Sequence, residues 1–259
     1  WTCDSSLPRA ETSTAHGRAT AHFSVHANDA LPNLDVPRLT YTGGYFNVSN
    51  NDALTHVDVP QLNSTNGDFF VSSNIALVNL GVPQLTSTGE DFVVYNNSAL
   101  TNLDVPHLTF TGRDFRVGDN DALTALDVPQ LNSVGKDFSV HNNDAITNLD
   151  VPQLTTTGGY FYVVDNDALT HVDVPQLVST GGGFFYLYNN SALTHLDIPR
   201  LISTGYLLMS CNGALTKLSL PQLSSTGGYF RLYSNGALNH VDLPQLTSTG
   251  GYFGVRAGQ

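Results

Sequence analysis

The feature that most constrains this chain is a repeat of 23 residues. From Asn28 onward ten copies follow one another, with the shared pattern NDALTHLDVPQLTSTGGYFxVxN. Each copy begins with Asn, and the starting residues are Asn28, Asn51, Asn74, Asn97, Asn120, Asn143, Asn166, Asn190, Asn212 and Asn235. The seventh copy gains one residue in the run Gly181–Gly183, and the eighth loses one near Gly205. A fixed period of this length predicts a solenoid of stacked coils, and it overrides the domain number suggested by chain length.

The pattern within one copy favours short strands. Pro stands at position ten of every copy, where it excludes a helix across the repeat and indicates a corner after a strand. Apolar residues recur at positions 4, 7, 9, 12, 19 and 21, and one coil cannot bury these columns alone, so the coils must stack in parallel. In the second copy these residues are Leu54, Val57, Val59, Leu62, Phe69 and Val71. We predict an all-β, right-handed parallel β-solenoid over residues 28–259, with an N-terminal cap or arm over residues 1–27.

Three further columns favour architectural roles. Position 19 is Phe in nine copies, with Leu207 as the exception, which predicts an aromatic stack along the core. Asn at position 1 predicts a ladder of side-chain amides bonded to the backbone of neighbouring coils. Gly at position 16, as in Gly89 and Gly112, predicts a bend that needs a positive φ.

The charge and the motifs exclude several function classes. The net charge is −12, from 22 acidic and 10 basic residues, which disfavours nucleic acid and anionic membranes as partners. No apolar run approaches the roughly 20 residues of a membrane-spanning helix, and the start at Trp1 without Met indicates a processed or trimmed polypeptide. No Ser-His-Asp order, paired acid, phosphate-cradling glycine loop or Cys/His cluster departs from the repeat. We therefore expect no enzyme activity, no cofactor and no metal.

Two cysteines are too few for a disulfide scaffold. Cys3 precedes the first coil and Cys211 lies in the eighth, so stacking at about 4.8 Å per coil separates them by more than about 30 Å. Two unpaired thiols are the simpler expectation, and a crosslink between chains is the alternative.

Leu, then Leu, then a Gly-containing bend, an apolar pair and Asn form a pattern that resembles the receptor L-domain repeat. The LDVPQL and TGGYF segments resemble the fungal cell-wall glycoproteins of that superfamily, and the resemblance covers residues 28–255. It implies a leucine-rich-repeat-like β-helix at the cell surface, which binds growth factors in receptors or contributes to wall organisation in fungi. It implies no enzyme chemistry.

This chain departs from the family at position 15, where the family has Ile or Val facing the core. Val134 fits, but the other nine copies have Thr42, Thr65, Thr88, Thr111, Thr157, Thr180, Thr204, Thr226 and Thr249. If the column faces inward, its hydroxyls satisfy the backbone at the bend. If it faces outward, it is a candidate ice-binding array. Such an array would pair it with a second Thr column at position 13, but position 13 holds several different residue types.

Position 8 is a second polar column and is Asp in eight copies. The residues are Asp35, Asp58, Asp104, Asp127, Asp150, Asp173, Asp197 and Asp242. Like charges at about 4.8 Å repel, so backbone hydrogen bonds, neighbouring histidines such as His195, or Ca²⁺ must offset them. Calcium binding is the most specific of these hypotheses. It is also the less favoured one, because no compact loop gathers enough oxygen ligands.

Positions 18, 20 and 22 flank the buried Phe and Val, so they point outward from the strand. Middle copies are acidic at position 18, with Asp68, Asp91, Asp114 and Asp137. Later copies are aromatic, with Tyr160, Tyr162, Phe184, Tyr186, Tyr188, Tyr206, Tyr229, Tyr233 and Tyr252. A contiguous exposed aromatic surface is typical of a site that binds protein or carbohydrate, and a purely stabilising tyrosine ladder is the alternative.

These patterns lead to one expected function and two alternatives. We expect a non-catalytic extracellular or cell-surface protein, structural or adhesive, that binds a protein or carbohydrate partner. Four glycosylation sequons, at Asn47, Asn63, Asn96 and Asn189, weakly support secretion. The alternatives are ice binding through the Thr column and an extracellular filament that self-associates through the solenoid ends.

Overall fold

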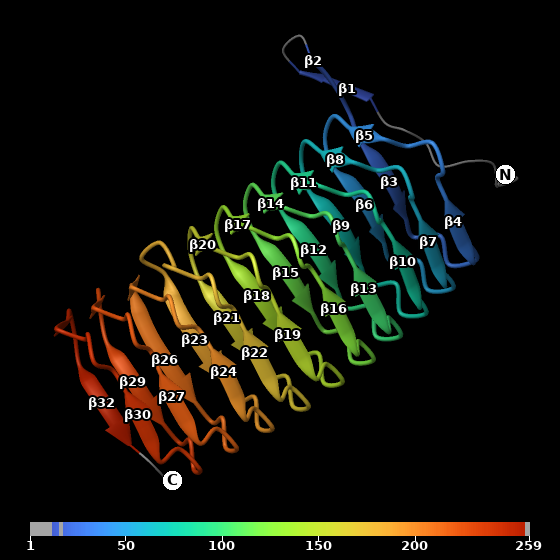
Figure 1. The fold of residues 1–259 in the computed structure, drawn as a ribbon. Helices are drawn as coiled ribbons and strands as arrows, with labels where there is room; N and C mark the ends of the chain where they lie inside the picture. The colour runs from blue at the N-terminus through green and yellow to red at the C-terminus, as the bar shows by residue number, and fades with distance from the viewer. Residues whose placement is uncertain (1–11, 16–17, 257–259) are drawn as a thin grey trace, which may run out of the picture.

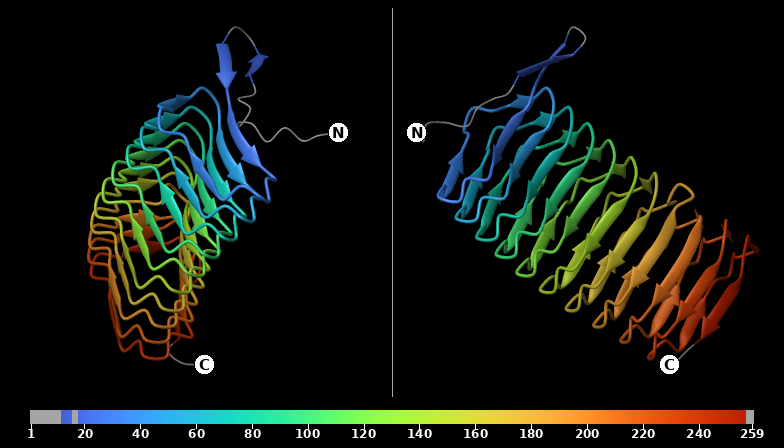
Figure 2. Two further views of the ribbon diagram at one scale, coloured as in Figure 1. Left: turned by 90° about the vertical axis from the view of Figure 1, so that its right-hand side faces the viewer. Right: turned by 180° about the vertical axis from the view of Figure 1, so that it is seen from behind.

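The structure, a computed structural model, describes residues 12–15 and 18–256, with side chains from residue 21 onward. Within this range every regular element is a β-strand, and the coils stack in one row from the N-terminal to the C-terminal end (Figure 1). Seen from the side, successive coils follow one another with a gradual rotation (Figure 2). The described ranges contain no helix that would be long and apolar enough to cross a bilayer. The predicted parallel β-solenoid of stacked 23-residue coils is confirmed.

One sheet, here called the long sheet, runs through the whole stack. Its eleven strands pair in parallel, each with the strand of the next coil. They are β3 (Phe23–His26), β6 (Phe46–Ser49), β9 (Phe69–Ser72), β12 (Phe92–Tyr95), β15 (Phe115–Gly118), β18 (Phe138–His141), β21 (Phe161–Val164), β23 (Phe184–Tyr188), β26 (Tyr206–Ser210), β29 (Phe230–Tyr233) and β32 (Phe253–Arg256). Because β3 belongs to this sheet, the sheet starts within the segment expected to be a cap or arm.

The second sheet, here called the Asp sheet, carries the Asp column and ends in the eighth coil. Its eight strands are β4 (Asn33–Asp35), β7 (His56–Asp58), β10 (Asn79–Gly81), β13 (Asn102–Asp104), β16 (Ala125–Asp127), β19 (Asn148–Asp150), β22 (His171–Asp173) and β24 (His195–Asp197). The strands β27 (Lys217–Ser219) and β30 (His240–Asp242) form a separate pair. The residue lost near Gly205 precedes this separation.

The third sheet, here called the Thr sheet, carries the Thr column and is also divided. Its first part contains β5 (Tyr41–Thr42), β8 (Ser64–Thr65), β11 (Ser87–Thr88), β14 (Phe110–Thr111), β17 (Ser133–Val134) and β20 (Thr156–Thr157). Its second part contains β25 (Ser203–Thr204), β28 (Ser225–Thr226) and β31 (Ser248–Thr249). Between them Ser179 makes only isolated bridges to Thr156 and Ser203. Outside these sheets, β1 (Thr12–Ala15) and β2 (Arg18–Ala21) form an antiparallel hairpin at the N-terminal end (Figure 1).

The six predicted apolar columns form the core. In the second coil Leu54, Val59, Leu62, Phe69 and Val71 are fully buried. The Phe column stacks as predicted, with neighbouring rings nearly parallel and centroids 5.1 Å apart between Phe46 and Phe69. Each coil buries these columns against the neighbouring coils, so a single coil is not expected to hold its shape alone.

The Asn ladder is confirmed, and its members from Asn51 onward are buried. The Asn51 N–H donates to Asn74 Oδ1 at 3.1 Å, and the Asn74 N–H donates to Asn97 Oδ1 at 3.1 Å. The residue before each ladder Asn has a positive φ, for example 56° at Asn50. The left-handed residue of each coil therefore lies beside a side-chain amide that satisfies the backbone of the neighbouring coil.

The bend predicted at the glycine column is present, but the predicted positive φ was wrong for most coils. Gly89 and Gly112 do not have the positive φ that was expected, whereas Gly181 does, at 54°. A Cβ at Gly112 would instead lie closer than 3.0 Å to the carbonyl of Gly89 in the preceding coil. The chain does bend at this column, and glycine is needed there because successive coils approach each other closely.

Candidate binding surface

The nine aromatic residues singled out from the sequence lie on the outward face of the long sheet. We call them the aromatic strip: Tyr160, Tyr162, Phe184, Tyr186, Tyr188, Tyr206, Tyr229, Tyr233 and Tyr252. The strip extends from β21 to β32. Its side chains point outward because alternate residues of each strand point away from the core. Its most exposed rings are Tyr160 at 44% and Tyr252 at 57%. Strand pairing places Tyr162 beside Tyr186 and Phe184 beside Tyr206.

Position 18 supplies the first aromatic column, in which the rings contact one another. Phe184 and Tyr206 are stacked with centroids 4.4 Å apart and planes at 15°. Tyr160 meets Phe184 at 5.3 Å and 87°, and Tyr229 meets Tyr206 at 4.9 Å. The Arg231 guanidinium lies 4.5 Å from the Tyr229 ring centroid, a cation–π distance. Ring contacts of this kind fix the column as a rigid surface.

Positions 20 and 22 supply a cluster of phenols. Tyr162 and Tyr186 are stacked at 5.2 Å and 17°, and Tyr188 lies 5.8 Å from Tyr186. Burial, followed by the neighbouring phenols Tyr233, Tyr162 and Tyr188, raises the pKa of Tyr186 to about 12. The hydroxyl of Tyr186 therefore stays protonated at neutral pH and remains both a donor and an acceptor.

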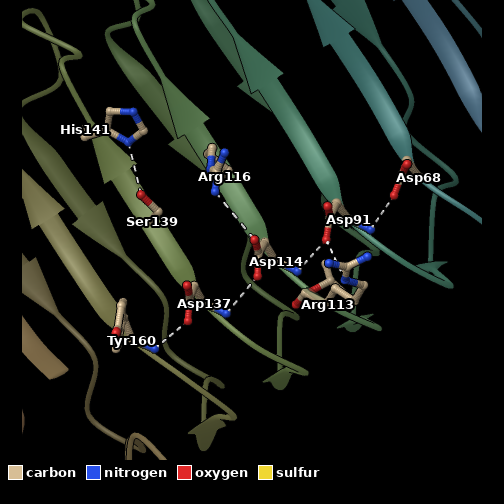
Figure 3. Close-up of polar contacts among 10 residues, drawn as sticks. Asp68, Asp91, Arg113, Asp114, Arg116, Asp137, Ser139, His141 and Tyr160 are labelled. Carbon is tan, nitrogen blue, oxygen red and sulfur yellow. Dashed lines mark hydrogen bonds and ion pairs between the residues drawn. The ribbon is translucent and has the colours of Figure 1, made fainter. Parts of the chain in front are cut away.

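Before the strip begins, an acidic ladder occupies position 18. Asp68 Oδ1 accepts the Asp91 N–H at 3.0 Å, Asp91 Oδ1 accepts the Asp114 N–H at 2.9 Å, and Asp114 Oδ1 accepts the Asp137 N–H at 3.2 Å (Figure 3). The last carboxylate, Asp137, accepts the Tyr160 N–H at 2.7 Å. The acidic and aromatic halves are thus two parts of one column. The sequence indicated the acidic residues but not their backbone partners, which depend on the register between coils.

His141 lies where the two halves of the face meet. Its Nδ1 is 3.0 Å from Ser139 Oγ, and its ring centroid is 6.1 Å from both Tyr95 and Tyr162. A Cβ at Gly118 would collide with the imidazole, so glycine in the preceding coil provides the space for this ring. Burial lowers the pKa of His141 below its usual 6.5, although nearby Asp119 opposes the shift. Sequence reasoning missed this cluster, and the Gly in an otherwise larger column was its only signal.

The Thr column points into the core, so the inward alternative is correct. Its members before the last coil are 0–4% exposed. Each hydroxyl donates to a backbone carbonyl at the bend, as Thr65 does to Gly67 O at 2.8 Å and Thr226 to Gly228 O at 2.9 Å. The residues proposed as an alternative ice-binding array, Thr42, Thr65, Thr88, Thr111, Thr157, Thr180, Thr204 and Thr226, are thereby removed from contact with ice, and Thr249 makes the same bond in the last coil.

The Asp column lies on the outward face of the Asp sheet. Asp173 Oδ1 is 3.4 Å from His195 Nε2, and burial raises the pKa of Asp173. Where Gly81 replaces Asp, a shallow hollow of about 390 Å³ opens beside Asp35 and Asp58. Among the described residues no three His, Cys, Asp or Glu side chains are grouped to hold a metal ion, so the calcium hypothesis gains no support.

The remaining singled-out residues are scattered. Asn63 and Asn96 are exposed, whereas Asn47 and Asn189 are half-buried. The Asn189 amide donates to Asp165 Oδ1 at 2.7 Å. Cys211 is a free, half-buried thiol, and Cys3 lies outside the described residues.

No protein-family model, curated protein or solved structure matches this chain. What the structure itself shows is a parallel β-solenoid of ten coils.

Proposed function

We propose that this chain is a non-catalytic structural or adhesive repeat protein of the cell surface or extracellular space. It binds a protein or carbohydrate partner through the aromatic strip. The resemblance of its repeat to the cell-surface L-domain pattern supports the extracellular setting, as do the exposed sequons at Asn63 and Asn96.

The aromatic strip carries this proposal. Five strands of one continuous sheet present aromatic side chains to solvent, and the ring contacts hold them in fixed positions. Rigid aromatic residues lose little conformational entropy on binding, which is why they are enriched at the centres of interfaces. Stabilising the sheet would not by itself require Tyr160, in the middle of the stack, to be 44% exposed.

A bead-adhesion assay tests the proposal. Beads coated with the protein are mixed with beads coated with extracellular matrix proteins, with polysaccharides or with the same protein. The strip variant carries Tyr160→Thr and Tyr252→Thr. The control variant carries Tyr41→Thr and Phe110→Thr, which remove aromatic rings of similar exposure, 53% and 41%, from the Thr sheet.

We expect adhesion to at least one coating, with loss in the strip variant and retention in the control. Adhesion that is equal in both variants, or absent from every bead pair, contradicts the proposed function. Circular dichroism of all three proteins verifies that the fold is retained.

A further inference from the structure

We propose that the aromatic strip recognises a second copy of this chain, with two strips packed face to face and the coil orders antiparallel. This inference rests on the proposed function, because it names the partner of the same surface. It makes the adhesion homophilic.

Charge is distributed unequally between the two ends of the strip. At the N-terminal end Asp137 adjoins Tyr160, and Asp165 follows β21 directly. At the C-terminal end Arg231 lies over Tyr229, and Arg256 pairs with Tyr233 in the neighbouring strand. Strands β26, β29 and β32 contain no acidic residue. A single strip is therefore acidic at one end and basic at the other.

An antiparallel pair of strips matches these ends. A two-fold axis along the strand direction, between β23 and β26, lays β21 of one copy over β29 of the other and β18 over β32. Positions along the strand are kept by this axis, so Asp165 of each copy lies one strand spacing and one residue from Arg256 of the other copy. Asp137 lies one strand spacing and two residues from Arg231 of the other copy. Two-fold symmetry is the commonest symmetry of contacts between identical protein chains. It forms each favourable charge pair two times in one dimer.

Ring orientation favours a protein surface over a sugar. Sugars pack their C–H groups against the electron-rich face of an aromatic ring. In the strip, Phe184 and Tyr206 cover each other, as do Tyr162 and Tyr186. Tyr206 also lies against Gly228, where a Cβ would collide with the ring. These stacked rings present their edges, and the tyrosines also present their hydroxyls. Because a phenol hydroxyl both donates and accepts, it can form a hydrogen bond with a tyrosine hydroxyl of the second copy.

The net charge of −12 does not prevent this contact, because much of it lies on another face. Seven of the 22 acidic residues belong to the Asp column on the Asp sheet, and an eighth, Asp242, lies on the separate strand β30. The strip spans four strand spacings, which is about 19 Å, so the contact falls in the class of small interfaces below about 1,200 Å². We therefore expect a weak dimer, which would support adhesion when many copies on two surfaces engage together.

Sedimentation equilibrium with a charge exchange tests the inference on the whole chain. One variant carries Arg231→Glu and Arg256→Glu, so both ends of its strip are acidic. The other carries Asp165→Lys, which weakens the acidic end without touching the Asp137 bond to the backbone. The control carries Arg38→Glu and Lys217→Glu, the same charge change as in the arginine variant, on two exposed residues outside the long sheet.

For the wild type and the control we expect a mass that rises from 27.8 kDa toward twice that value as the concentration approaches about 1 mM. Each charge variant alone should associate at least about tenfold more weakly, and an equimolar mixture of the two should associate more strongly than either. The mixture requires both variants to be folded, so its recovery separates a charge effect from misfolding.

A wild type that stays monomeric up to about 1 mM overturns the inference, and so does association that neither charge variant weakens. Adhesion of beads to a matrix protein or polysaccharide, combined with a monomeric wild type, would assign the strip to that other partner. That outcome would leave the proposed function intact.

Discussion

Replacing Asn97 with Ala should destabilise the solenoid far more than a typical polar-to-Ala change. Asn97 is fully buried, and its Oδ1 accepts the backbone N–H of Asn74 at 3.1 Å. Its Nδ2 donates to Val71 O and Tyr95 O, both at 3.1 Å, and to Asn120 Oδ1 at 3.4 Å. Alanine leaves at least the Asn74 N–H and one carbonyl without this partner. At about 1–3 kcal/mol for each buried orphan group, we expect a loss of about 3 kcal/mol.

Urea unfolding followed by far-ultraviolet circular dichroism measures this loss. The matched control is Asn102→Ala, an exposed Asn in the Asp sheet, for which we expect a change within about 0.5 kcal/mol. Coils contact only their neighbours, so a defect in a central coil should also make the transition less cooperative. If Asn97→Ala costs no more than Asn102→Ala, the Asn ladder does not stabilise the stack as described.

Two further predictions concern His141 and the Thr column. Because burial lowers the pKa of His141, the folded protein disfavours the imidazolium, so the stability due to neutral His141 is complete above about pH 6.5 and is lost as the pH falls below it. In urea titrations the wild type should therefore lose stability relative to His141→Gln as the pH falls from about 8 to about 5. If the difference in free energy of unfolding between the two proteins is the same at both pH values, the pKa of His141 is not lowered by folding. The wild type should show no thermal hysteresis in a freezing assay, because Thr88 and Thr111 are fully buried. Hysteresis that disappears in a Thr88→Val, Thr111→Val variant would contradict the inward placement.

The repeat made the fold predictable because each column is sampled ten times. A single Leu or Phe indicates little, but Phe46, Phe69 and Phe92 at one spacing identify an inward column whatever the local sequence preferences are. The same spacing predicted the outward position of Tyr162 and Tyr186. Features that depend on side-chain alternation alone were therefore accessible from the sequence.

Features that depend on contacts between coils were not accessible. The distance between Gly112 and the Gly89 carbonyl is a property of the stacking, so the sequence suggested a positive φ as the reason for glycine where the structure has a close approach. The bonds from Asp91 and Asp137 to the next coil require a register that the residue types do not specify. The direction of the Thr column was open for the same reason, because Thr65 satisfies either an inward or an outward position until its carbonyl partner is known.

The two irregular copies leave the long sheet, which carries the proposed binding surface, unbroken. The extra residue in the seventh coil is absorbed at Gly181 and Gly182, whose φ values are 54° and 90°, and Gly182 has open space around it. The Thr sheet and the Asp sheet are both interrupted in this region, whereas the long sheet continues from β23 to β26 through five paired residues. The stacked pair Phe184 and Tyr206 lies on that junction. An insertion placed in the long sheet would separate these rings and shift the acidic end of the strip relative to Arg231. A turn that absorbs the irregularity keeps the two ends in register, which an antiparallel contact between two copies requires.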